Sequence, residues 1–186
     1  MNEAGSKIQG IMRQMIGRLL LQNISGGHGL RAINFNQSKM SKRTPKNIFV
    51  EGAIPATFIA DSIQKHNTQT SIGAHSIFLG QVRSDVIDNK NVAAIDYTAY
   101  EEMALEKMHE IREAIFTKYS LTCMHVHHSV GRVSAGELCL FVFTSARHRT
   151  DAINACEETV ERIKAELPIW GKELFEDESF QWKVNQ

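Results

Sequence analysis

A chain of 186 residues has room for one domain of ordinary size and a tail, and its composition, 42% hydrophobic and 23% charged, is that of a globular protein. With only 12 Gly and 3 Pro, neither a fibrous nor a low-complexity chain fits. The formal charge is zero, but residues 1–50 carry a net charge of +7 and residues 51–186 a net charge of −7. The two segments are therefore interpreted separately.

The basic N-terminal segment is expected to lie outside the folded core. Between Lys7 and Gln22, apolar residues recur at helical spacing with arginines away from that stripe. Organellar transit peptides, membrane-surface helices and nucleic-acid-binding arms share this pattern. The alternative is a dispensable extension, since Met40 is a second plausible start. We predict a basic extension over residues 1–45, disordered or partly helical, and one domain over residues 46–186.

The rest of the chain alternates between helical and strand-like patterns. Pro55 suits the first turn of a helix, Gly80 indicates a bulge or a close approach within a strand, and Pro168 ends the last helix. This order predicts an α+β domain with helices packed on a largely antiparallel sheet. The predicted elements are a helix over 54–66, a strand over 75–82, a turn over 85–91, a strand over 92–100, a helix over 101–119, strands over 122–130 and 137–144, and a helix over 150–167.

Cysteine usage indicates a reducing compartment, and we predict a cytoplasmic protein. Cys123, Cys139 and Cys156 are odd in number and widely spaced, which excludes a disulfide framework. Cys139 and Cys156 fall in apolar segments, which are poor settings for a reactive thiolate. The longest strongly apolar run, residues 138–143, is too short to span a membrane. We expect neither a membrane nor a nucleic acid as partner, because the excess positive charge is confined to the extension.

Basic residues near the ends of the last helix are the strongest candidates for a binding site. Arg147, His148 and Arg149 follow a buried strand and precede a helix, where free N–H groups and arginine forks favour a phosphate or carboxylate. A solvated basic loop is the alternative. Helical geometry places Lys164 between the apolar stripe and water, where an amine is partly desolvated, and directs Arg162 to solvent. The alternative for Lys164 is a stem that only covers the edge of the core.

Histidines on one predicted strand raise the question of a metal. His125 and His127 lie on the same face of this strand, and a metal hydrolase built on them and His148 is one rival function. No third ligand stands at a familiar spacing, so we expect no metal and no cofactor. His128, on the other face, is predicted to be a hydrogen-bonded core histidine.

Five segments stand in a fixed order along the chain. They are FLGQVR (78–83), the tyrosine strand with EEMALEKM (97–108), HHSVGRVSAGE (127–137), FTSARHR (143–149) and IKAELPIWGKE (163–173). Together they resemble the large subunit of molybdopterin synthase, the MoaE family. The resemblance covers residues 72–176, and its specificity comes from the combination of F-x-G-x-V-R, a basic strand end and a K-x-x-x-P-I-W turn.

The resemblance implies a sulfurtransferase of molybdenum-cofactor biosynthesis with an α/β hammerhead fold. It implies that sulfur arrives as the C-terminal thiocarboxylate of a small ubiquitin-like subunit with a Gly-Gly tail, and that cyclic pyranopterin monophosphate is converted to the dithiolene molybdopterin. Two large subunits would form a central homodimer with a small subunit at each end, a heterotetramer. A module that docks the ubiquitin-like carrier without catalysis is the alternative function.

The resemblance also implies the site residues. Lys164 would be the essential lysine, acting as a base or stabilising negative charge as the thiolate adds to the pterin. Two departures occur. The basic motif is one residue longer here, and the second catalytic lysine of the family falls on Gly171, for which we hypothesise that Lys172 substitutes. The implied catalytic set is Arg83, Lys164 and Lys172, and the implied substrate-binding set is Gln81, Val82, Arg83, His148, Arg149, Lys164, Gly171, Lys172 and Glu173.

Overall fold

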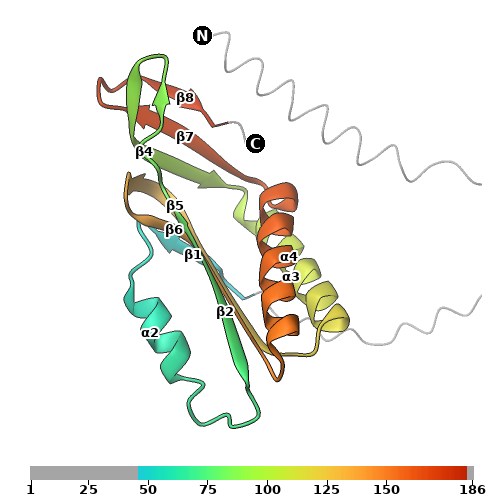
Figure 1. The fold of residues 1–186 in the computed structure, drawn as a ribbon. Coiled ribbons are helices and arrows are strands. Elements are labelled where there is room, and N and C mark those ends of the chain that lie inside the picture. Colours follow the sequence, from blue (N-terminus) through green and yellow to red (C-terminus); the bar gives the residue numbers. More distant parts are fainter. Residues whose placement is uncertain (1–45, 184–186) are drawn as a thin grey trace, which may run out of the picture. The chain divides into compact units, whose positions relative to one another are not determined.

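The computed structural model describes residues 46–183, so the predictions for residues 1–45 lie outside it. Figure 1 shows the elements along the chain, and each label is used below with these bounds. They are β1 (Phe49–Glu51), α2 (Thr57–Gln64), β2 (Ala74–Gln81), β3 (Val86–Ile87), β4 (Lys90–Ala99), α3 (Glu101–Lys118), β5 (Leu121–Ser134), β6 (Leu138–Ala146), α4 (Arg149–Glu166), β7 (Ile169–Phe175) and β8 (Phe180–Trp182).

The predicted elements up to α4 are confirmed within a few residues, and the main errors lie after Pro168. That segment was predicted as a turn but forms β7 and, with β8, a hairpin. The predicted turn over 85–91 is a hairpin between β3 and β4. Its two central residues, Asp88 and Asn89, have φ of 49° and 61°, as a tight two-residue turn requires.

The sheet follows the order β2-β6-β5-β4-β7-β8, and every pairing along this path is antiparallel. Two strands lie off the path: β1 pairs with β5 in parallel, and β3 pairs with β4. The apolar strand β6 lies inside the sheet between β2 and β5, as its composition predicts. The predicted α+β class with a largely antiparallel sheet is confirmed.

Helices cover both faces of the sheet. In Figure 1, α3 and α4 lie together on one side and α2 lies on the other. Side chains of β6 alternate between the two layers: Leu140 and Val142 join the cluster formed with α3 and α4, whereas Phe141 and Phe143 pack with residues of α2. Among the described residues, no helix is both long and apolar enough to cross a membrane.

A third cluster of buried residues positions the end of β2. It contains Val82, Val92, Ile95, Val133, Cys139 and Phe175. The strand irregularity predicted at Gly80 is present, because the pairing of β2 with β6 shifts between Gly80 and Gln81. A Cβ on Gly80 would stand 3.0 Å from the Cβ of Leu140, so the glycine also permits a close approach of the two strands.

Candidate functional site

A cleft of about 810 Å³ lies where three distant parts of the chain meet. These parts are the segment after β2, the C-terminal half of α4 and the hairpin of β7 with β8. The cleft therefore depends on the two strands that followed Pro168 and were not predicted. Its lining residues are Arg83, Asp85, Ile87, Glu161, Lys164, Ala165, Glu173, Gln181, Trp182 and Lys183.

Two of the predicted catalytic residues, Arg83 and Lys164, come together in this cleft. The side chain of Arg83 is 77% exposed, and its guanidinium pairs with Asp85 at 2.9 Å. The Lys164 ammonium lies 5.9 Å from the ring centroid of Phe78, the first residue of the F-x-G-x-V-R motif. Both cations are thus accessible to a ligand that enters the cleft.

The predicted environments of Lys164 and Arg162 are wrong. Lys164 is exposed rather than partly desolvated. Arg162 is only 26% exposed and pairs with Glu166 at 2.6 Å, because α3 packs along that side of α4. The helical wheel misplaced Arg162 because it could not include the neighbouring helix α3.

Glu173 is the most buried charged residue of the cleft, with 5% of its surface exposed. Its Oε2 accepts a hydrogen bond from the Gln181 amide at 2.8 Å, and its Oε1 accepts one from the Lys183 ammonium at 3.2 Å. A buried carboxylate needs such partners to offset the cost of leaving water. Glu173 therefore ties β8 to β7 and fixes the position of a third cation, Lys183.

The structure does not bring Lys172 into the cleft. Successive residues of a strand point to opposite faces, so Lys172 faces away from Glu173. Its ammonium lies 3.8 Å from the ring centroid of Phe180, and it is not among the residues that line the cleft. Gly171 is buried and faces the same side as Glu173. The hypothesis that Lys172 substitutes for a lysine at Gly171 does not fit this geometry.

Neither Gln81 nor Val82 is among the residues that line the cleft. Val82 is 1% exposed. Its N–H donates to the carbonyl of Glu137 at 3.0 Å, and its carbonyl accepts from the N–H of Gly136 at 2.8 Å. Both backbone groups are used, so Val82 positions Arg83. Gln81 is exposed at the bulge and is absent from the cleft lining.

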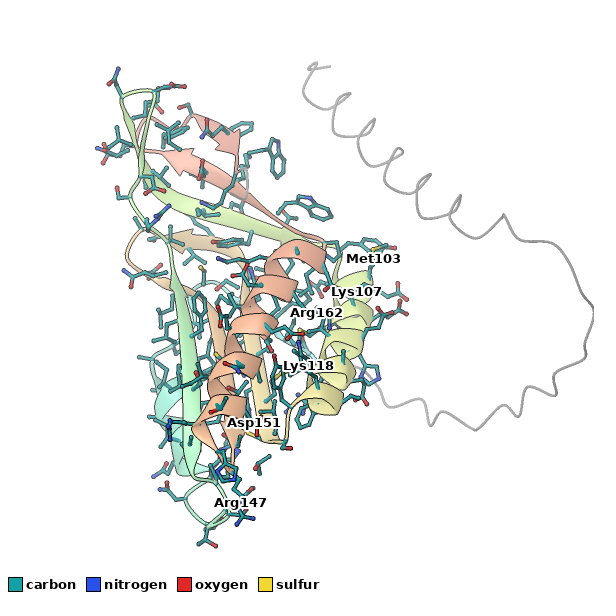
Figure 2. All side chains as sticks on the ribbon, turned by 45° about the vertical axis from the view of Figure 1, so that its right-hand side comes forward. Met103, Lys107, Lys118, Arg147, Asp151 and Arg162 are labelled. Carbon is teal, nitrogen blue, oxygen red and sulfur yellow. The ribbon has the colours of Figure 1, made fainter. Side chains whose placement is uncertain are left out.

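The predicted phosphate-binding pair, His148 and Arg149, lies at the other end of α4. Arg149 begins the helix and Lys164 stands 15 residues later, which corresponds to about 22 Å along the axis at about 1.5 Å per residue. Figure 2 marks this end of the helix by Arg147 and Asp151, and it lies far along α4 from β7. One chain therefore holds the predicted site in two separate halves.

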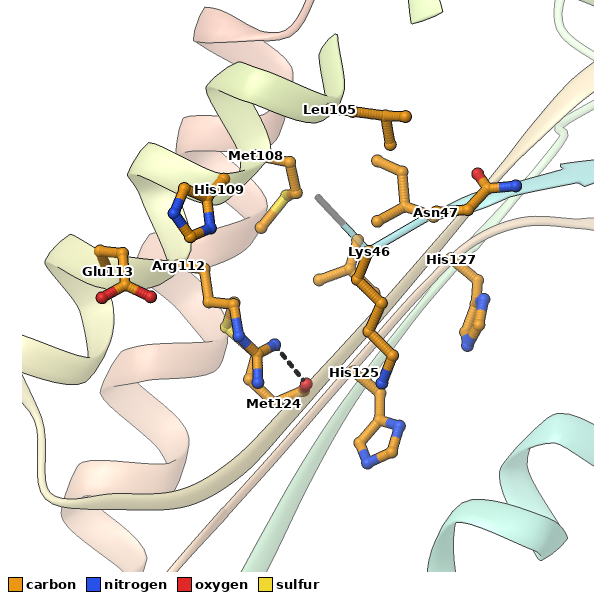
Figure 3. A pocket seen from close by; sticks show the side chains of 12 residues that line it. Lys46, Asn47, Leu105, Met108, His109, Arg112, Glu113, Met124, His125 and His127 are labelled. Atoms are coloured by element: carbon orange, nitrogen blue, oxygen red, sulfur yellow. Dashed lines mark hydrogen bonds between the residues drawn. The ribbon is translucent and has the colours of Figure 1, made fainter. Parts of the chain in front are cut away.

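A second, smaller pocket of about 180 Å³ lies between α3 and β5. Figure 3 shows Lys46, Arg112, His125 and His127 around it, and the guanidinium of Arg112 donates to the carbonyl of Met124 at 2.8 Å. Its lining shares no residue with the large cleft. Its lining contains none of the catalytic or substrate-binding residues that the family resemblance implies.

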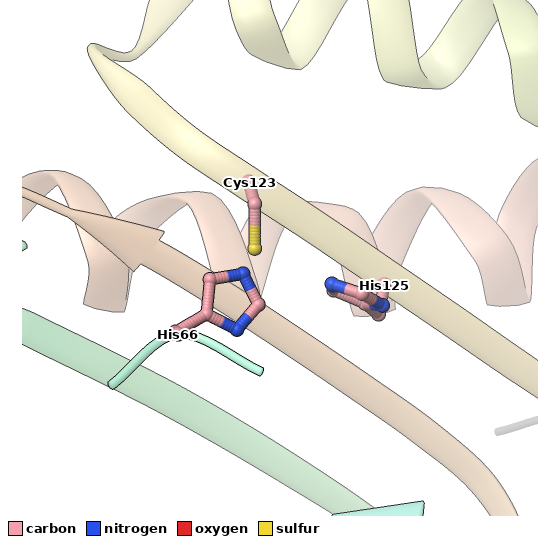
Figure 4. A group of neighbouring side chains, drawn as sticks. All are labelled: His66, Cys123 and His125. Atoms are coloured by element: carbon pink, nitrogen blue, oxygen red, sulfur yellow. The ribbon is translucent and has the colours of Figure 1, made fainter. Parts of the chain in front are cut away.

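Three side chains on the α2 side of the sheet could hold a metal ion. His66, Cys123 and His125 have ligand atoms within 4.8 Å of one another and point toward a common centre in Figure 4. The Nδ1 of His66 bonds the carbonyl of Ser62 at 2.6 Å, which leaves Nε2 for a ligand. Among residues 46–183, the set of His125, His127 and His148 is not found as such a group. The rival metal hydrolase thus lacks its predicted ligand set.

The remaining histidine and cysteine predictions agree with the structure. His128 is buried, its Nδ1 bonds the carbonyl of Ser129 at 2.8 Å, and burial lowers its pKa. Burial raises the pKa of all three thiols, those of Cys123, Cys139 and Cys156. The chain therefore offers no activated thiolate among its cysteines.

Acid should destabilise the fold through His125. Burial, with smaller contributions from nearby cations, lowers the pKa of His125 to about 4. Since an unfolded histidine titrates near about pH 6.5, the unfolded chain binds a proton that the folded chain does not bind between about pH 6.5 and about pH 4. The stabilisation is complete above this window and is lost as the pH falls through it. Urea unfolding at several pH values should show this loss of stability, and the loss should be smaller in His125→Gln. An equal pH dependence in the wild type and in His125→Gln would contradict the role of His125.

Sequence reasoning missed Lys183 and Gln181. Both belong to the β8 segment, which was not predicted as a strand. The available signal was the alternation of Phe180, Gln181, Trp182 and Lys183 after an acidic turn, which is typical of a short strand with one polar face.

Comparisons with known proteins place this fold and cleft in context. The family model described as MoaE protein matches residues 54–166. The chain is 33% identical over 122 residues to the molybdopterin synthase catalytic subunit of Emericella nidulans, an alignment that covers 66% of this chain and 62% of that protein. It is 33% identical over 113 residues to the subunit of that name from Pyrococcus abyssi, covering 61% of this chain and 76% of that one.

The fold agrees with the sequence matches. The crystal structure of molybdopterin synthase from Staphylococcus aureus superposes with a TM-score of 0.65 at 28% identity, covering 74% of this chain and 96% of that one. The chain spans less than two thirds of the length of the Emericella nidulans protein. Because the family model covers more than half of the chain and includes the segments that bear Arg83 and Lys164, the chain belongs to the MoaE family.

Proposed function

We propose that the chain is the catalytic subunit of a molybdopterin synthase. In this proposal it transfers sulfur from the C-terminal thiocarboxylate of a small ubiquitin-like subunit to cyclic pyranopterin monophosphate, forming the dithiolene of molybdopterin. The observation that carries the proposal is the meeting of Arg83 and Lys164 in one cleft, at positions that match the family's motifs.

The chemistry of the cleft suits an anionic substrate. The planar fork of Arg83 can bind phosphate or carboxylate oxygens, and the ammonium of Lys164 can stabilise negative charge that develops as the thiocarboxylate sulfur attacks. The thiols of this chain have raised pKa values because they are buried. A sulfur source outside the chain is consistent with this.

The separation of Lys164 from His148 and Arg149 supports a dimeric site. We propose that a second copy of the chain brings the N-terminal end of its α4 to the cleft, so that each site draws residues from two subunits. Twofold symmetry would then create two equivalent sites, each served by one small subunit. This is the arrangement of a heterotetramer with a homodimeric centre.

The domain boundaries and the location belong to the same proposal. Residues 46–186 form the catalytic domain, and residues 1–45 are an extension that the reaction does not need. The free cysteines fit a reducing compartment, and the cytoplasm is the proposed location.

Reconstitution tests the proposed function. Purified full-length chain, a thiocarboxylated small subunit and cyclic pyranopterin monophosphate should together yield the dithiolene product, detected by mass spectrometry after alkylation of the two thiols. The small subunit with an ordinary carboxylate is the control and should give no product. A stable complex that yields no product would favour the docking module, an alternative that the missing lysine at Gly171 supports. The absence of both the complex and the product would overturn the proposal.

A further inference from the structure

The third cation of the cleft, Lys183, has no role in the function as described so far. We infer that Lys183 supplies the second catalytic amine of the cleft and contacts the anionic substrate opposite Lys164. This inference rests on the proposed function. It replaces the hypothesis that Lys172 supplies this amine.

Lys183 stands beside the position that lacks a side chain. The N–H of Lys183 donates to the carbonyl of Gly171 at 2.8 Å. A Cβ built on Gly171 would lie 3.6 Å from the Cβ of Lys183. Two side chains that start so close on the same face of a hairpin can reach the same region. Lys183 can therefore bring its amine to the space that a lysine at position 171 would serve.

The space around Gly171 favours a glycine at this position, with the amine supplied by Lys183 instead. The same Cβ would stand 3.0 Å from a methyl group of Ile95 and 3.5 Å from the ring of Tyr97. The first distance is tighter than ordinary van der Waals contact, so a side chain at position 171 would have to displace Ile95 slightly. With glycine there, β8 packs against β7 and Lys183 enters the cleft from the neighbouring strand.

Glu173 holds the Lys183 ammonium in place. The side chain of Lys183 is 31% exposed, that of Glu173 is buried, and their charged atoms lie 3.2 Å apart. An ammonium has three donors, so one bond to Glu173 leaves two for a ligand. Gln181 occupies the other carboxylate oxygen, which keeps Glu173 from turning away. A charge fixed before the substrate arrives needs little reorganisation during the reaction.

Lys164 and Lys183 lie in the same region of the cleft. The thiol of Cys139, whose pKa is raised mainly by burial, experiences an opposing electrostatic effect from both Lys183 and Lys164. Both lysines line the cleft. Lys172 is tied to Phe180 on the opposite face. The two amines positioned to act on one substrate are therefore those of Lys164 and Lys183.

Substitution of Lys183, with Lys172 as the matched control, tests the inference in the reconstituted synthase. Lys183→Ala should lower kcat/KM by about 10- to 100-fold, as the loss of one preorganised charge contact does. Lys172→Ala should change kcat/KM by less than about twofold, because its amine does not face the cleft. Lys183→Arg should recover part of the loss. Adding Gly171→Lys to Lys183→Ala should also restore activity, since the new amine starts from the adjacent position.

A purely structural role for Lys183 can be separated from contact with substrate. Lys183→Ala leaves the buried Glu173 without its cation, which itself destabilises the hairpin. The double variant Lys183→Ala with Glu173→Gln removes that unpaired charge. If Lys183 contacts substrate, this variant recovers thermal stability and small-subunit binding but not kcat/KM. Recovery of kcat/KM together with stability would overturn the inference.

The remaining outcomes distinguish the inference from the proposed function. Full activity of Lys183→Ala beside an active wild type would overturn the role of Lys183 and leave the proposed function standing. A loss in Lys172→Ala equal to that in Lys183→Ala would also overturn it. An inactive wild-type protein in the presence of a competent small subunit would overturn both.

Discussion

Lys164→Ala should lower the rate of sulfur transfer by about 100- to 1,000-fold, the effect of removing one group that stabilises developing negative charge. The fold should tolerate this change because Lys164 is exposed and, within residues 46–183, forms no ion pair. The melting temperature and the complex with the small subunit should stay as in the wild type. Single-turnover measurement of dithiolene formation, with thermal unfolding in parallel, checks both expectations.

Lys107→Ala is the control for a lost surface charge. Lys107 lies on α3, pairs with Glu110 on the same helix and is absent from the cleft lining. Figure 2 shows it on the helix pair, away from the sheet. The Lys107→Ala variant should retain the wild-type rate. A normal rate in Lys164→Ala, or an equal loss in Lys107→Ala, would show that the cleft is not the site of the proposed sulfur transfer.

Two inactive variants should restore each other's activity when they form mixed dimers. Lys164→Ala damages the cleft, and Arg149→Ala damages the opposite end of α4. If each site takes Lys164 from one subunit and Arg149 from the other, a mixed dimer keeps one intact site. Random exchange of subunits should then give about a quarter of the wild-type activity, because half of the dimers are mixed and each has one intact site of two.

Variants that carry different affinity tags allow the activity of the mixed dimer to be measured by itself. Co-expression with two affinity tags isolates the mixed dimer, which should show about half of the wild-type activity. The mixture of Lys164→Ala with the double variant Lys164→Ala and Arg149→Ala is the control and should stay inactive. A mixed dimer without activity would mean that Arg149 does not act across the dimer.

The sequence predicted the part of the fold that local patterns control. Helix α3 has apolar residues at steps of three and four, and α4 ends two residues before Pro168. The bounds of both helices were therefore predicted within a few residues. The apolar middle of β6 identified a central strand. These features depend on neighbours along the chain, which is what periodicity and capping describe.

The same patterns failed where partners come from elsewhere. Strand β7 was missed because Pro168 and Gly171 are typical of a turn, whereas pairing with β4 and β8 stabilises the segment as a strand. The wheel of α4 misplaced Arg162 because α3 packs there. In each case, tertiary contacts outweighed local preference.

By itself, the sequence determined the order of the main elements up to α4, the α+β class and the identity of three cleft residues, Arg83, Lys164 and Glu173. Only the tertiary structure decided which lysine joins them. The sequence favours Lys172, which lies within the family motif, but strand alternation turns Lys172 toward Phe180, and pairing of β8 with β7 carries Lys183 to Glu173. The physical reason is that a side chain's direction follows from strand register, and register is set by hydrogen bonds between segments distant in the chain.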